Sequence, residues 1–226
     1  MNGRDMILGR IREALRRPAP APHHHRHGTE DAGSPRDWLP PVGESFQERV
    51  DLFAGNAASL KATFEQHSSL ESAAGRIVEV AAVERWRRVA SHSDPLTEQL
   101  VAPLAAAGIG TLWIDGGYEP PALEECDAGI TTCEALIAQT GSVLVSSAGS
   151  GGRALSVLPP HHVVIARRSQ MLPDLHCAFT AIRQKFGESF PSMLSFITGP
   201  SRTGDIERIL VLGAHGPKKL TILMVP

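Results

Sequence analysis

The sequence predicts an α/β protein with a central, mostly parallel sheet and helices on both faces. From about residue 75, short runs of aliphatic and β-branched residues alternate with longer helical patterns, which is the spacing of βαβ units. No period of roughly 20–50 residues recurs, so the pattern excludes a solenoid. The chain has 226 residues, of which 42% are hydrophobic and 20% charged. That composition supports one large domain with a hydrophobic core and excludes wholesale disorder.

The first 45 residues differ from the rest and are predicted to form an N-terminal helical arm followed by a linker. Residues 4–17 repeat apolar residues at helical spacing and carry arginines on the other face, which predicts an amphipathic helix. We expect it to pack on its own domain, with docking on a partner or a membrane surface left open. Residues 18–45 are rich in proline and glycine, which predicts a linker. The α/β domain is then residues 46–226.

The linker contains four histidines between residues 23 and 27. Histidine-rich tracts bind metal ions. This one is short, internal and interrupted by Arg26, so we expect adventitious affinity and no functional metal site.

Residues 46–70 predict a long helix whose apolar residues step by four and three positions. Such a seam faces one surface, either the core of the same domain or a second subunit. Further helices are predicted at 81–90, at 95–108 after the cap Asp94, at 133–139 after the capping-box pattern Thr131-x-x-Glu134, and at 173–186. Strands are predicted at 76–80, 110–114, 127–130, 142–147, 162–166, 194–197, 208–212 and 219–225.

Charge and cysteine usage exclude several functions. The net charge of −2 does not fit a basic nucleic-acid-binding surface. No apolar stretch reaches the roughly 18 residues of a membrane span, and the charged N-terminus does not resemble a secretory signal, so we expect a cytoplasmic protein. The three cysteines, Cys126, Cys133 and Cys177, are too few for a four-thiolate cluster and predict ordinary small side chains. We expect no cofactor bound by this chain alone.

The familiar catalytic motifs are absent. There is no P-loop and no H-E-x-x-H. Gly149–Gly152 lacks dinucleotide-binding spacing and predicts a turn. His161 and His162 are adjacent, so on a strand they point to opposite faces and cannot share a metal ion.

Two segments remain as candidate sites. One runs from residue 198 to 207 and continues to a Gly-Ala-His-Gly-Pro run at 213–217. The other is the Ile-Ala-Gln-Thr-Gly-Ser run at 137–142, followed by Arg153. In open α/β sheets, ligands bind beyond the carboxyl ends of the strands, and the first segment follows the predicted strand at 194–197. Arginine can hold a carboxylate or phosphate at two points, and histidine titrates near neutral pH. The predicted ligand-binding residues are Gln139, Thr140, Arg153, Gly199, Ser201, Arg202, Thr203 and Asp205, with His215 as an acid, base or orienting residue. The alternative is a tight structural loop in which Arg202 pairs with Asp205 or Glu207.

The same segments carry a resemblance to a known family. The runs DAGITTCEALIAQTGSVLVSS, GGRALSVLPPHHVVI and ITGPSRTGDIERILVLGAHGPKKLTILMV resemble the LUD domain family over about residues 75–226. The resemblance implies a fold like the sugar-phosphate isomerase and CoA-transferase superfamily. It also implies a part in oxidising L-lactate beside iron–sulfur partner proteins, as a subunit that carries no redox centre itself.

One position departs from the family. Members often have Glu where this chain has Gln139, and an amide cannot act as a carboxylate nucleophile or general base. The resemblance therefore implies a pathway more firmly than a reaction. The leading hypothesis is an accessory subunit that binds a small organic acid or a phosphorylated cofactor. The alternatives are an independent isomerase or acyl transferase acting on a sugar phosphate or CoA ester, and a pure protein-interaction module.

Overall fold

A computed structural model of the protein describes residues 3–15, 40–203, 211–212 and 216–226. The chain forms two compact units, Met1–Leu39 and Pro40–Pro226. In the first unit, α1 (Gly3–Leu15) is the predicted N-terminal helix. The histidine tract and most of the predicted linker lie outside the described residues, and the domain boundary at residue 45 stays a prediction.

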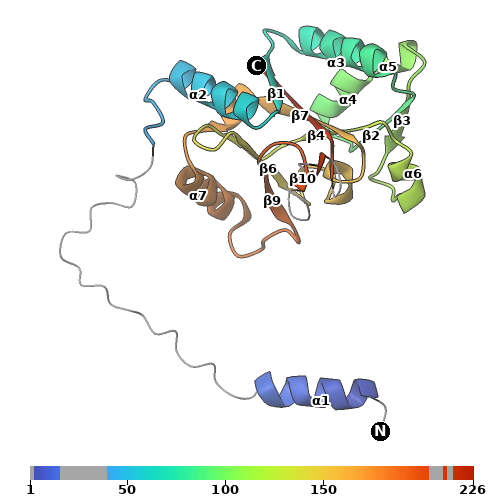
Figure 1. Ribbon diagram of the computed structural model, residues 1–226, viewed down its shortest axis with the longest axis vertical. Helices are drawn as coiled ribbons and strands as arrows, with labels where there is room; N and C mark the ends of the chain where they lie inside the picture. The colour runs from blue at the N-terminus through green and yellow to red at the C-terminus, as the bar shows by residue number, and fades with distance from the viewer. Residues whose placement is uncertain (1–2, 16–39, 204–210, 213–215) are drawn as a thin grey trace, which may run out of the picture. The chain divides into compact units, whose positions relative to one another are not determined.

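The centre of the second unit is a six-stranded sheet in which every neighbouring pair is parallel (Figure 1). Its strand order is β1-β12-β7-β4-β2-β3. The strands are β1 (Thr63–Gln66), β2 (Arg88–Ser91), β3 (Gly110–Trp113), β4 (Ala128–Thr132), β7 (His161–Arg167) and β12 (Lys219–Val225). The predicted parallel α/β architecture is thus confirmed.

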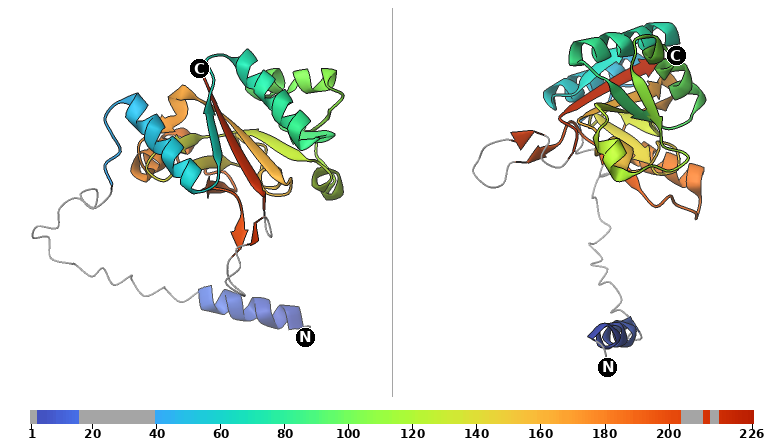
Figure 2. Two further views of the ribbon diagram at one scale, coloured as in Figure 1. Left: turned by 45° about the horizontal axis from the view of Figure 1, so that its top comes forward. Right: turned by 90° about the vertical axis from the view of Figure 1, so that its right-hand side faces the viewer.

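One face of this sheet is covered by α3 (Leu70–Glu84), α4 (Pro95–Val101) and α5 (Pro103–Ala106), which lie together in Figures 1 and 2. Their apolar side chains pack against alternate residues of the strands, such as Val163 and Ile165 of β7 and Leu223 of β12. Since neighbouring residues of a strand point to opposite faces, Val164 and Ile222 belong to the core on the other side.

The second face is covered by α2 (Phe46–Ser59) and by a four-stranded sheet of order β8-β5-β6-β9. These strands are β5 (Ala135–Ile137), β6 (Ser142–Ser146), β8 (Met171–Leu172) and β9 (Leu194–Ile197). The outer face of this smaller sheet packs on α7 (Leu175–Phe186), through Ala178 and Ile182. The remaining elements are α6 (Pro120–Glu124), η2 (Ala154–Ser156), η3 (Arg168–Gln170), β10 (Arg202–Thr203) and β11 (Val211–Leu212).

The α2 helix packs on its own domain and ends earlier than the sequence predicted. Its seam residues Val50, Phe53 and Ala57 are fully buried in the core of the same domain. A helix through residue 70 was wrong. After Ser59 the chain turns at Lys61, in the left-handed region at φ 66°, and β1 then pairs with β12. Sheet pairing ends the helix where apolar periodicity alone would continue it.

Three other predictions were wrong because tertiary contacts override local pattern. The strand at 76–80 lies inside α3, whose buried residues Ala73, Ala74, Ile77 and Ala81 keep helical spacing. The helix at 81–90 stops at Arg85, in the left-handed region at φ 57°, and gives way to β2. The helix at 133–139 is strand β5.

The other elements agree with the sequence. Strands predicted at 110–114, 127–130, 142–147, 162–166, 194–197 and 219–225 are present within a residue or two. The helix from residue 95 is split into α4 and α5, and α7 begins after its cap Asp174. Of the strand predicted at 208–212, only β11 falls among the described residues.

Candidate functional site

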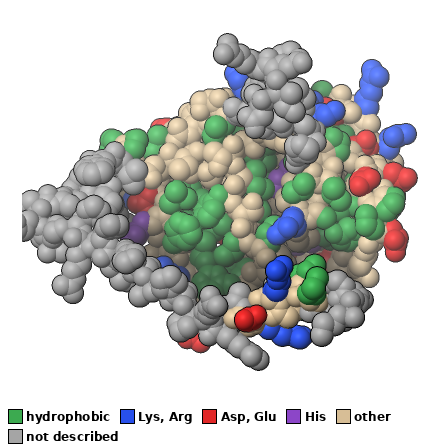
Figure 3. Space-filling view, turned by 60° about the horizontal axis from the view of Figure 1, so that its bottom comes forward, with side chains coloured by type: hydrophobic (Ala, Val, Ile, Leu, Met, Phe, Trp, Pro, Cys, Tyr) green, Lys and Arg blue, Asp and Glu red, His purple; other side chains and the backbone are tan. Residues whose placement is uncertain are grey.

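Three of the predicted ligand-binding residues line one cavity of about 380 Å³, here called the Arg153 cavity. Arg153 stands at the start of η2, whereas Gly199 and Ser201 follow β9. Segments almost fifty residues apart are therefore brought together. Figure 3 shows one face of the protein, on which hydrophobic side chains gather with a few Lys and Arg side chains among them.

The Arg153 cavity combines one cation with hydroxyl groups and an apolar wall. Arg153 is exposed, and within the described part of the chain no acidic side chain pairs with its guanidinium. Ser201 is held by its backbone N–H, which donates to the carbonyl of Pro217 at 2.9 Å. The apolar wall and the remaining hydroxyls come from Ser156, Val157, Met193, Leu194, Ser195 and Ile197. Such a lining suits a small anion with an apolar part.

The other predicted residues have three different outcomes. Arg202 and Thr203 form β10, directly after Ser201, and pair with β11; their side chains are outside the description. Asp205 and His215 lie outside the described residues. The predicted roles of these four residues in ligand binding therefore stay predictions.

Gln139 and Thr140 do not line the Arg153 cavity. Their segment anchors α2 instead. The Asn56 side-chain amide donates to the carbonyls of Ala138 and Gln139, at 2.9 and 3.0 Å. The Gln139 side chain donates to the carbonyl of Pro40 at 3.3 Å. A carboxylate could not donate this hydrogen bond, so the amide of Gln139 fits the position and makes a structural contact.

A second, more polar cavity of about 300 Å³ lies at the carboxyl edge of the parallel sheet, where β4 and β7 end. We call it the Glu134 cavity, and sequence reasoning missed it. The signal was available: the carboxyl-edge rule, applied to the strand at 127–130, points to the residues directly after it. Instead, Glu134 was interpreted as part of a helix cap. The lining contains the charged residues Asp94, Glu134, Arg167 and Lys185.

Glu134 is the best-held side chain of this cavity. Only 8% of its side chain is exposed, and it forms an ion pair with Lys185 of α7. Its Oε1 accepts a hydrogen bond from the Ser146 hydroxyl at 2.5 Å. Ser146 Oγ in turn accepts from the backbone N–H of Gly149 at 2.9 Å. A Cβ at Gly149 would lie 2.5 Å from Glu134 Oε1, so the glycine permits this close approach.

His92 braces the loop above the Glu134 cavity. Its Nε2 accepts a hydrogen bond from the backbone N–H of Thr132 at 3.2 Å, so the neutral ring carries its proton on Nδ1. Burial lowers the pKa of His92, against the opposing charges of Asp94 and Asp115. The Thr132 hydroxyl donates to the carbonyl of Gly149 at 2.7 Å. These contacts fix the turn at 149–152 that the sequence predicted.

Two of the three cysteines are withdrawn from solvent. Cys126 and Cys133 are buried, and burial raises the pKa of both thiols. Within the ranges that the structure describes, no three His, Cys, Asp or Glu side chains are placed to hold a metal ion. Over the same ranges, no helix has the length and apolar character to cross a membrane.

The fold and the sequence are each similar to known proteins. The structure resembles a DUF162 family protein from Deinococcus radiodurans, with a TM-score of 0.62 and 22% identity, over 81% of this chain and 100% of that one. Residues 121–225 match the LUD domain. Over those residues the chain is similar to the LUD domain family.

Individual relatives carry the name lactate utilization protein C. The protein of that name from Shouchella clausii is 29% identical over 100% of this chain and 98% of its own length. The Bacillus subtilis protein is 38% identical over 104 residues, which are 45% of this chain. That match spans only 43% of the Bacillus subtilis protein. A similar match, 38% identical over 45% of each chain, is to "Uncharacterized protein YkgG" of Escherichia coli.

Proposed function

We propose that this protein acts in lactate utilization, as an accessory subunit of an L-lactate-oxidising system whose iron–sulfur centres belong to partner proteins. The observation that carries the proposal is the likeness to lactate utilization protein C of Shouchella clausii along the whole chain. Three cysteines in 226 residues, two of them buried with raised thiol pKa, support a subunit that carries no cluster itself.

The proposed ligand is a small organic anion or the phosphate of a cofactor, held in the Arg153 cavity. Arg153 supplies the charge, and Gly199 and Ser201 supply backbone and hydroxyl contacts. Arg202, Thr203, Asp205 and His215 complete the site in this proposal, since they follow Ser201 or precede Gly216 in the chain. Among the described residues the exposed Arg153 guanidinium has no acidic partner, and this supports an anion as the ligand.

Calorimetric titration of the full chain with L-lactate and pyruvate tests the site. We expect Arg153→Ala to weaken binding by roughly tenfold or more, the usual size of a charge-assisted hydrogen bond. Arg153→Lys should recover part of the loss, because the charge returns without the planar fork. Arg183→Ala, on the exposed face of α7, is the matched control. Affinities that stay unchanged in both Arg153 variants would contradict the site.

The partnership is tested by an anaerobic pull-down from lactate-grown native cells, with iron measured in the eluate. Co-purifying iron–sulfur proteins would support the subunit role. Deleting residues 1–45 then tests docking by the arm: lost assembly with an intact fold favours it. A protein that assembles through the arm yet binds no anion would favour the pure interaction module.

A second candidate is an independent enzyme acting on a sugar phosphate or CoA ester. The buried carboxylate of Glu134 at the carboxyl edge favours it, since such groups are typical general acids or bases. Turnover by the pure protein that is lost in Glu134→Gln or His215→Ala would support this function. Absence of turnover with both substrate classes would count against it.

A further inference from the structure

The sheet face under α3 changes from apolar to polar toward the amino ends of its strands. Farther along, Val163, Ile165 and Leu223 face the helix. At the amino ends, His161, Lys219 and Thr221 take the same face, and Thr63 of β1 pairs in register with Thr221. Burying polar side chains between a helix and a sheet costs free energy unless they are hydrogen-bonded.

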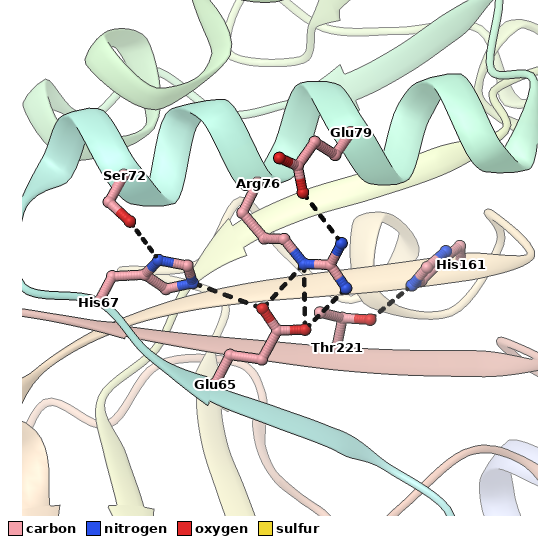
Figure 4. Close-up of polar contacts among 7 residues, drawn as sticks. All are labelled: Glu65, His67, Ser72, Arg76, Glu79, His161 and Thr221. Carbon is pink, nitrogen blue, oxygen red and sulfur yellow. Dashed lines mark hydrogen bonds and ion pairs between the residues drawn. The ribbon is translucent and has the colours of Figure 1, made fainter.

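A cavity of about 360 Å³, here called the Lys218 cavity, lies between these residues and α3. Figure 4 shows part of its wall, with Arg76 projecting from α3 and with His161 and Thr221 on adjacent strands. Its charged lining residues are Lys61, Arg76, Lys218 and Lys219, against a single acid, Glu84. It shares no lining residue with the Arg153 cavity or the Glu134 cavity.

The carboxylates near this cavity are already engaged. Glu65 accepts from Arg76 through both oxygens, with the Nε–Oε2 distance at 2.8 Å (Figure 4). Glu79 accepts from the same guanidinium at 3.3 Å. Both oxygens of Glu84 lie 2.6 Å from the Lys219 ammonium. Arg76 and Lys219 are therefore neutralised locally.

Two cations remain unmatched. Within the described part of the chain, no carboxylate approaches the ammonium of Lys61 or Lys218. Lys61 follows the C-terminal end of α2, where a cation is favoured by the helix carbonyls. Its left-handed backbone, φ 66°, is nevertheless unusual for a residue with a side chain. Lys218 lies directly before β12.

His161 adds a buried hydrogen-bonding group to the wall. The residue is 5% exposed, and its Nε2 is 2.9 Å from the Thr221 hydroxyl. Its Nδ1 is buried and has no hydrogen-bond partner among the described residues. Such groups are rare in folded proteins unless a ligand or ordered water meets them. The Trp86 ring packs edge-on against the imidazole, with centroids 5.2 Å apart, and holds it in place.

We propose that the Lys218 cavity binds a phosphate group, either as a free ion or as part of a larger molecule. A phosphate dianion matches the two unmatched ammonium groups in charge, and its oxygens accept from lysine and hydroxyl donors. This site is separate from the proposed anion site at Arg153, so each can fail without the other.

Calorimetric titration of the full chain with inorganic phosphate at low ionic strength tests the proposal. We expect a binding event that persists in Arg153→Ala and that Lys218→Ala weakens roughly tenfold or more, with a similar loss for Lys61→Ala. Lys218→Arg should retain most of the affinity. Arg183→Ala is the matched surface control, and Arg153→Ala separates this site from the Arg153 cavity.

An imidazole NMR signal gives the second readout. Phosphate should shift the His161 resonance in the wild type and in Arg153→Ala, but not in Lys61→Ala/Lys218→Ala. Retained binding in the lysine variants, a His161 signal unmoved by bound phosphate, or no phosphate binding to the wild type would each overturn the proposal. If phosphate binds, repeating the titration with a nucleotide separates a free-ion site from a larger phosphorylated ligand: tighter nucleotide binding, lost in the same variants, favours the latter.

Discussion

The two ends of one parallel sheet use charge in opposite ways. At the carboxyl edge, the Glu134 cavity balances two acids against two bases, and its central carboxylate is 8% exposed. At the amino edge, the Lys218 cavity has four bases and one acid, and its Glu84–Lys219 pair is 30% and 54% exposed.

We infer that the charges of the Glu134 cavity mainly affect the stability of the fold, whereas those of the Lys218 cavity mainly affect ligand binding. A carboxylate withdrawn from water needs its partners, so the charges of the Glu134 cavity hold the fold together. Exposed ion pairs contribute little to stability, so the excess charge of the Lys218 cavity is available for a ligand. Substitutions at the carboxyl edge should therefore change unfolding, and those at the amino edge should change binding.

The largest effect is expected at Glu134. Glu134→Ala leaves Ser146 and Lys185 without their shared acceptor. We expect the free energy of unfolding to fall by about 2 kcal/mol, since Lys185 regains water while the buried Ser146 hydroxyl does not. Urea unfolding at neutral pH measures the change.

Glu84→Ala is the matched control at the amino edge. It removes a carboxylate from an ion pair of short distance but high exposure, and it should cost less than about 1 kcal/mol. Equal losses in the two variants would contradict the separation of stability from binding.

The same contrast explains what the sequence could predict. Several strands of the two sheets were predictable because β6, β7 and β12 are largely apolar runs. Strands β1 and β2 were not, because TFEQ and RVAS are short and become strands only through pairing with β12, β3 and β4.

Some residues of the candidate sites could likewise be predicted from the sequence, and others could not. Arg153, Gly199 and Ser201 were found because glycine, hydroxyl and arginine residues cluster in the sequence. Glu134 was missed because its partners come from positions 146 and 185, and Lys218 was missed because Lys61 lies far away in the chain. Charge balance around a cavity is a property of the folded chain, which no local motif encodes.

Acidification should lower the free energy of unfolding through buried histidines at both edges of the sheet. The loss per histidine and per pH unit is smaller than the loss expected for Glu134→Ala. Burial lowers the pKa of His161 to about 4 and of His162 to about 3. Below the ordinary histidine pKa near 6.5, these histidines are protonated in the unfolded chain but stay neutral in the folded protein. The free energy of unfolding therefore falls as the pH drops from about 6.5 toward 4. Each ring contributes a loss on the order of 1 kcal/mol per pH unit. Urea unfolding at a series of pH values measures the slope.

Single substitutions assign that slope. His161→Gln should make the unfolding free energy depend less steeply on pH, because it removes the buried histidine at the amino edge. His92→Gln should have the same effect through the carboxyl edge, where burial also lowers the histidine pKa. His176 is exposed on α7, so His176→Gln should leave the slope unchanged. A slope that none of the buried-histidine variants alters would assign acid sensitivity to the carboxylates instead.

The smallest effect is expected at Lys218. Its side chain is exposed and makes no hydrogen bond or ion pair to the described residues, so Lys218→Ala should change the free energy of unfolding by less than about 0.5 kcal/mol. Removing one of several like charges around a cavity relieves repulsion, so a slight gain in stability is the expected direction. The unfolding of wild type and variant should be compared with and without inorganic phosphate. A ligand that binds only the folded state raises stability, so wild type should gain with phosphate and the variant should gain less. A large loss of stability in Lys218→Ala without phosphate would mean that the amino edge depends on this lysine for folding, and the contrast between the two edges would fail.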